Sequence, residues 1–156
     1  MAIDHSAVID RFEAILTANT TPVFAAVFPG EPLGLPLGGP YAAFWYLGRG
    51  MGTRSGEMSM GNAMITESWS FACWWPREPE RATLERWEND ISDADQAIQT
   101  AIRGDSQLSG LCSDLWVDGS SVGYRSFPLG SQPNSLYRAL TFTVHIEDLE
   151  GEAIAA

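Results

Sequence analysis

Apolar residues between positions 79 and 103 recur at spacings of three and four, which predicts one long amphipathic helix over this stretch. Pro79 suits the first turn of a helix, and Gly104 follows the last apolar pair. At about 1.5 Å per residue the helix would be roughly 37 Å long, enough to cross a small sheet. We therefore expect the flanking segments to form the sheet on which its apolar stripe lies. The stripe consists of Leu84, Trp87, Ile91, Ala94, Ile98, Ala101 and Ile102.

Residues 4–18 predict a first helix, with Asp4 as its N-cap and an apolar face that includes Phe12 and Leu16. Runs of apolar or alternating residues predict the strands between the helices and after them. Asp118 and Gly119 are a strong tight-turn signal, so the two strands around them are expected to pair as a hairpin. The predicted strands are 23–28, 41–47, 64–75, 113–117, 122–127 and 137–146.

Glycine, proline and methionine interrupt this pattern in long stretches between the predicted strands. Residues 30–40 are crowded with glycine and proline, and residues 48–62 contain five glycines and three methionines. Both stretches predict projecting loops, and residues 128–134 predict a further irregular excursion. Residues 147–156 are expected to form an acidic C-terminal tail.

This order of elements predicts a single α+β domain over residues 1–156, with a mainly antiparallel or mixed sheet and both helices on one face. The strands at 23–28 and 41–47 are apolar on both sides, and Trp74 points away from the Trp69 and Trp75 side of its strand. A monomer rarely leaves such a surface bare. The second face of the sheet therefore predicts oligomerisation or a permanent partner.

Composition and charge narrow the functional classes. An apolar content of 45% with six tryptophans indicates an ordered globule, and 20 acidic against 9 basic side chains give a net charge of −11. This charge disfavours a nucleic-acid reader.

Cys73 and Cys112 form no CxxC pair, so we expect buried free thiols and a reducing compartment. The N-terminal region has no apolar run long enough for a signal peptide or a membrane span, which predicts synthesis in a cytoplasm.

The sequence contains no motif of catalysis or of cofactor binding. His5 and His145 are the two histidines, and their spacing from cysteines and carboxylates suits no metal, so both are expected on the surface. A Ser/His/Asp triad cannot be identified from sequence, because its members need not be adjacent. The glycines at 48–52 lack both the GxGxxG spacing and a following GK[ST]. We therefore expect no enzyme, no cofactor and no metal.

The arrangement of these segments resembles the tail terminator proteins of long-tailed bacteriophages, the group of lambda minor tail protein U-like and tail-to-head joining proteins. The resemblance covers most of the chain. It is carried by the N-terminal helix, the apolar strands before the glycine-rich loop, SWSFACWW leading into the long helix, the connection DSQLSGLCSDLWV and the final strand YRALTFTVHI.

The resemblance implies a structural virion protein rather than an enzyme. Such proteins form a homohexameric ring on the head-proximal end of the tail tube, end its polymerisation and join it to the head–tail connector or adaptor. It also implies location in the virion tail after synthesis in the bacterial host cytoplasm. Six copies would carry a charge of −66, six times −11. An acidic face lining the channel would let DNA pass without specific binding.

Loop position predicts the residues that contact other subunits or the tube. These are Arg49, Met51, Arg54, Met58 and Met60, with Trp74 as a buried anchor. Three other functions remain open from the sequence. The chain could be another head–tail connector or head-completion protein, or an acidic DNA mimic that inhibits a basic nucleic-acid enzyme as a monomer or dimer. A small-molecule enzyme would need a convergent polar pocket, which a sequence does not display.

Overall fold

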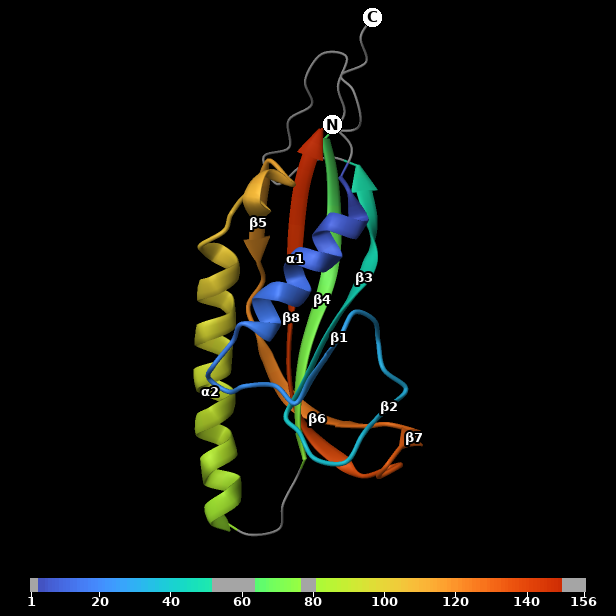
Figure 1. Cartoon of the computed structure of the whole chain (residues 1–156), viewed down its shortest axis with the longest axis vertical. Coiled ribbons are helices and arrows are strands. Elements are labelled where there is room, and N and C mark those ends of the chain that lie inside the picture. Colours follow the sequence, from blue (N-terminus) through green and yellow to red (C-terminus); the bar gives the residue numbers. More distant parts are fainter. Residues whose placement is uncertain (1–2, 52–63, 77–80, 150–156) are drawn as a thin grey trace, which may run out of the picture.

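The computed structural model describes residues 3–51, 64–76 and 81–149. Two helices lie on one face of a long, mixed sheet, as Figure 1 shows, which confirms the expected α+β class. They are α1 (His5–Thr17) and α2 (Arg81–Arg103). The expected start of α2 at Pro79 lies outside the described residues.

The first helix, α1, forms where capping and apolar periodicity agree. Asp4 accepts a hydrogen bond from the Ala7 backbone N–H at 3.2 Å, as expected of an N-cap. Most of the predicted apolar faces are buried against the sheet, while Trp87 is partly buried and Ala101 is exposed beside α1. The side chain of Leu84 lies outside those described. The buried members are Val8, Phe12, Ile15 and Leu16 on α1, and Ile91, Ala94, Ile98 and Ile102 on α2.

The main sheet has the strand order β1-β3-β4-β8-β5, and β6 also pairs with β8. β1 pairs with β3 in parallel, and every other pair in this sheet is antiparallel. β4 and β8 lie side by side at its centre. Successive side chains on each strand point alternately to the face that the helices cover and to the second face. The strands are β1 (Ala26–Phe28), β3 (Tyr41–Met51), β4 (Met64–Pro76), β5 (Asp114–Val117), β6 (Ser121–Ser126) and β8 (Leu136–Leu149).

The expected hairpin between β5 and β6 is wrong. β4 occupies one edge of β8, and both β5 and β6 pair with the other edge, one after the other. The Asp118 N–H donates to the Thr143 carbonyl at 2.9 Å, so the chain continues along β8 instead of folding back. Residues 118–120 face only residues 142–143, which makes a bulge of one residue. The Asp118-Gly119 pair predicts a bend, but hydrogen bonding to β8 determines which strand β6 pairs with.

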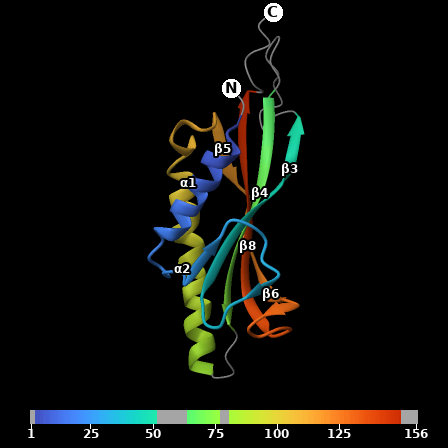
Figure 2. The same ribbon diagram turned by 45° about the vertical axis from the view of Figure 1, so that its right-hand side comes forward.

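The two proline- and glycine-rich excursions contain short strands that pair with each other. β2 (Gly34–Leu35) and β7 (Leu129–Gly130) form a parallel pair, where the sequence predicts no regular structure in 30–40 and 128–134. This pair and its connections pack over one end of the second face of the sheet (Figure 2). They build a second core from Leu35, Tyr41, Ala43, Ala72, Trp74, Phe127, Tyr137 and Ala139. At this end of the sheet the chain itself provides the cover that the sequence assigns to a partner.

Two strands extend into segments that the sequence assigns to loops. β3 continues to Met51, because residues 48–51 pair with residues 65–68 of β4 after a bulge at Leu47. Gly48 takes a φ of +138° at this bulge, a conformation that favours glycine. β8 continues to Leu149, so residues 147–149 of the expected acidic tail are part of a strand. The rest of both segments, 52–63 and 150–156, lies outside the described residues.

Candidate functional site

Two of the predicted contact residues already have partners within the chain: Arg49 forms an ion pair, and Trp74 is buried. Arg49 donates from Nη2 and Nε to Glu67 at 2.8 and 3.1 Å. Trp74 is 1% exposed and stacks on Trp45 with ring centroids 6.3 Å apart, so it anchors the chain's own second core. Met51 ends β3, and its side chain is not among those described. Arg54, Met58 and Met60 lie outside the described residues.

Glu67 links three elements on the helix-covered face. Its side chain is fully buried, and its Oε2 also accepts a hydrogen bond from His5 Nε2 at 2.7 Å. The His5 ring makes edge-to-face contacts with two aromatic rings. Its centroid lies 4.8 Å from that of Tyr46 and 5.6 Å from that of Trp69. His5 is therefore only partly exposed and fastens the start of α1 to the sheet, whereas the sequence predicts a surface residue. The hydrogen bonds to Glu67 raise the pKa of Arg49.

The outer edge of β3 is open for most of its length. β1 pairs with residues 41–43 of β3, and within the described part of the chain no strand pairs with the outer edge beyond them. Tyr46 and Leu47 are 40% and 53% exposed along this edge. An edge strand presents unpaired backbone N–H and C=O groups that can pair with another chain.

The opposite edge of the sheet is formed by β5 and β6, and it too carries exposed apolar side chains. Figure 1 shows β3 and β5 on opposite sides of the sheet. Val122 and Tyr124 on β6 are 43% and 54% exposed. The Tyr124 ring packs under the Arg138 guanidinium, whose carbon lies 4.7 Å from the ring centroid. The molecule therefore has two different sheet edges, each with a pair of exposed apolar side chains.

On the second face, beyond the second core, three polar side chains form a hydrogen-bonded row. Ser68 Oγ lies 2.8 Å from His145 Nδ1, and His145 Nε2 lies 2.8 Å from Asp118 Oδ2. Ser68 and His145 are direct partners across β4 and β8, and Trp116 of β5 stacks on the His145 ring with centroids 5.2 Å apart. Sequence reasoning missed this row because strand register and the bulge at 118–120 bring its members together.

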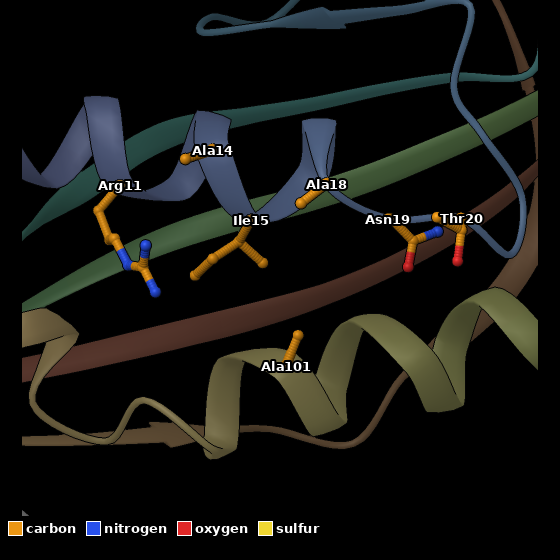
Figure 3. Close-up of a pocket in the computed structure, with 7 residues that line it drawn as sticks. All are labelled: Arg11, Ala14, Ile15, Ala18, Asn19, Thr20 and Ala101. Atoms are coloured by element: carbon orange, nitrogen blue, oxygen red, sulfur yellow. The ribbon is translucent and has the colours of Figure 1, made fainter.

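Several shallow grooves lie on the surface of the described residues, among them the following two. The first is a volume of about 290 Å³ between α1 and α2, and Figure 3 shows Arg11, Asn19 and Ala101 among its lining. Arg11 donates to Asp105 at 2.8 Å, so the charged group of this groove is already paired. The second, about 260 Å³, lies on the second face between Trp45 and β6. Neither groove collects several titratable side chains around one point.

The described residues contain no group of three or more potential metal ligands. No helix in residues 3–51, 64–76 and 81–149 combines the length and the apolar character needed to cross a bilayer.

The two thiols are buried, as the sequence predicts, and should be unreactive in the folded protein. Burial raises the pKa of Cys73, and burial with nearby carboxylates raises the pKa of Cys112 to about 12. Because both thiols are favoured in the neutral form, their contribution to stability should be complete below about pH 9 and should decrease as the pH rises above it.

We therefore expect a thiol reagent at pH 8 to modify Cys73 and Cys112 at the rate of unfolding, and denaturant to make both reactive at once. Absorbance of released thionitrobenzoate measures this. Rapid modification of either thiol in native buffer would contradict the buried assignment.

Comparison with models of protein families finds no match to the chain, and comparison with curated protein sequences finds no significant similarity.

Proposed function

We propose that this protein is a structural subunit that assembles into a closed ring through its two sheet edges. The observation that carries the proposal is a pair of edges on opposite sides of one sheet, β3 beyond Ala43 and β5 with β6, with which no other described strand pairs. When two different surfaces of a subunit bind each other head to tail, the assembly closes into a ring if the rotation permits.

The side chains at the two edges suit such an interface. Tyr46 and Leu47 at one edge and Val122 and Tyr124 at the other are exposed, and aromatic residues are enriched at protein interfaces. Strand pairing would satisfy the backbone groups of both edges and bury these side chains. In the resulting ring the sheets of neighbouring subunits would be continuous.

The ring that we propose is the homohexamer of a phage tail terminator. It would cap the tail tube, end its polymerisation and join it to the head–tail connector, which places the protein in the virion tail. The net charge of −11 per subunit supports a channel that repels DNA. Exposed carboxylates along α2, among them Glu85 and Asp93, contribute to this charge.

Native mass spectrometry over a rising concentration series tests the assembly, with negative-stain images at the highest concentration. We expect closed hexamers of the wild-type chain. Leu47→Lys should abolish them, because a lysine on an edge strand opposes pairing with another strand. Val122→Lys should do the same from the other edge. Val23→Lys is the matched control, since Val23 is 66% exposed and belongs to none of the strands.

A mixture of the two edge variants distinguishes head-to-tail pairing from other modes. Each variant keeps one intact edge, so Leu47→Lys and Val122→Lys together should form a heterodimer that neither forms alone. Monomers of the wild-type chain at every concentration, with purified tail tubes present or absent, would contradict the ring and favour the acidic DNA mimic.

A further inference from the structure

The polar row on the second face has the arrangement of an activated nucleophile. Asp118 lies beside His145 because the chain at the bulge, residues 118–120, stays alongside β8. There the Asp118 N–H donates a hydrogen bond to the Thr143 carbonyl. A carboxylate only accepts hydrogen bonds, so in the neutral imidazole His145 Nε2 carries the hydrogen and donates it to Asp118. This leaves the lone pair of Nδ1 directed at Ser68 Oγ, 2.8 Å away.

The surroundings hold this tautomer and ring position. Trp116 stacks on the imidazole at an interplanar angle of 21°, and the register of β4, β8 and β5 places Ser68, His145 and Trp116 in one line across the sheet. A hydroxyl bonded to a base that is oriented by a third group is the general signature of nucleophilic catalysis.

Ser68 is half-buried, and the space beside it over β3 is open. Its partner on the other side of β4 is Gly48, which has no side chain, and a Cβ built there would meet no heavy atom within 4 Å. Farther along the same face lies the groove of about 260 Å³, lined by Trp45, Ala72 and Thr141 among others. Trp45 is the register partner of Ser70, two residues from Ser68, so an apolar chain attached to the reacting atom would extend towards this groove.

We propose that Ser68 is a nucleophile that accepts the acyl group of an activated ester, with His145 as its base and Asp118 as a positioning residue. Ser68 Oγ forms a bond to the carbonyl carbon, and its proton moves to His145 Nδ1. The bond from carbon to the leaving alkoxide breaks, and the alkoxide takes the proton from the imidazolium. The products are acyl-Ser68 and a free alcohol. This activity is independent of ring assembly.

An alkyl fluorophosphonate tests the nucleophile, because Ser68 would displace fluoride and retain the phosphonyl group. We expect intact-mass spectrometry to show one adduct per chain and peptide mapping to place it on Ser68. Ser68→Ala should abolish it, and His145→Gln should slow it by about 100-fold, within the usual contribution of a general base. Ser70→Ala, on the same face of β4, should have no effect and serves as the control.

Variants at Asp118 separate positioning from folding, because this side chain is more than half exposed. Asp118→Asn should slow labelling, and Asp118→Glu should restore it, with circular dichroism unchanged in both. Absence of an adduct on the wild-type chain, an adduct on another serine, or labelling at the wild-type rate in His145→Gln would overturn the proposal.

Discussion

Replacing Phe71 with alanine should lower the free energy of unfolding by about 3–5 kcal/mol, the usual cost of truncating a buried aromatic side chain. Phe71 is fully buried at the middle of β4, where α1 meets the sheet. Its ring centroid lies 4.9 Å from that of Phe12, 5.3 Å from that of Phe142 and 5.7 Å from that of Phe44. Alanine would leave a cavity between three strands and a helix that the surrounding backbone cannot easily fill.

Urea unfolding followed by circular dichroism measures this loss. The corresponding fall in melting temperature is roughly 6–20 °C for a chain of this size. Val23→Ala is the control, because Val23 is largely exposed and its truncation should change stability by less than about 0.5 kcal/mol. A loss below about 1 kcal/mol for Phe71→Ala would show that this ring does not lie in the packed core.

Replacing Gly34 with alanine should separate β2 from β7 and uncover the second core. A Cβ at Gly34 would lie 2.2 Å from both the backbone carbon and the carbonyl oxygen of Leu129, so the two strands cannot remain paired. Their separation would break the hydrogen bonds from Leu129 N–H to the Leu33 carbonyl and from Ser131 N–H to the Leu35 carbonyl. Exposure of the Leu35 side chain alone would cost about 1.5–3 kcal/mol.

The effect of Gly34→Ala should be concentrated on one side of the sheet. Amide hydrogen exchange should accelerate in 33–37 and 127–131, while α1 and the centre of β4 stay protected. Gly30→Ala is the matched control in the same segment, since a Cβ there meets nothing within 4 Å. Unchanged exchange in the Gly34 variant would contradict the close approach of β2 and β7.

The helices and the central strands could be predicted from sequence because local patterns and tertiary packing agree there. Asp4 caps α1, the stripe of α2 from Ile91 to Ile102 is buried except at Ala101, and the alternation of β8 matches its buried side. The site could not be predicted in the same way. Ser68, Asp118 and His145 are far apart in sequence, and their contact depends on strand register and on one extra residue between β5 and β6.

The segments 30–40 and 128–134 also show that local composition does not predict contacts between distant parts of the chain. Their composition predicts that they leave the main sheet, and they do. It does not predict that Gly34 and Gly130 let two backbones meet, because such an approach depends on the absence of a Cβ at both places at once. The tryptophan that suggests a partner from sequence, Trp74, is buried by this pairing instead.

The sequence by itself determined the α+β class, the two helices, the long central strands and the burial of both thiols, because each depends on periodicity or on the character of single side chains. Tertiary structure alone decided that β5 and β6 share one edge of β8, that β2 and β7 cover the end of the second face, and that no described strand pairs with β3 beyond Ala43 on its outer edge. These features depend on hydrogen bonds between backbone groups that are far apart in the sequence, and a local pattern of residues does not specify such pairings.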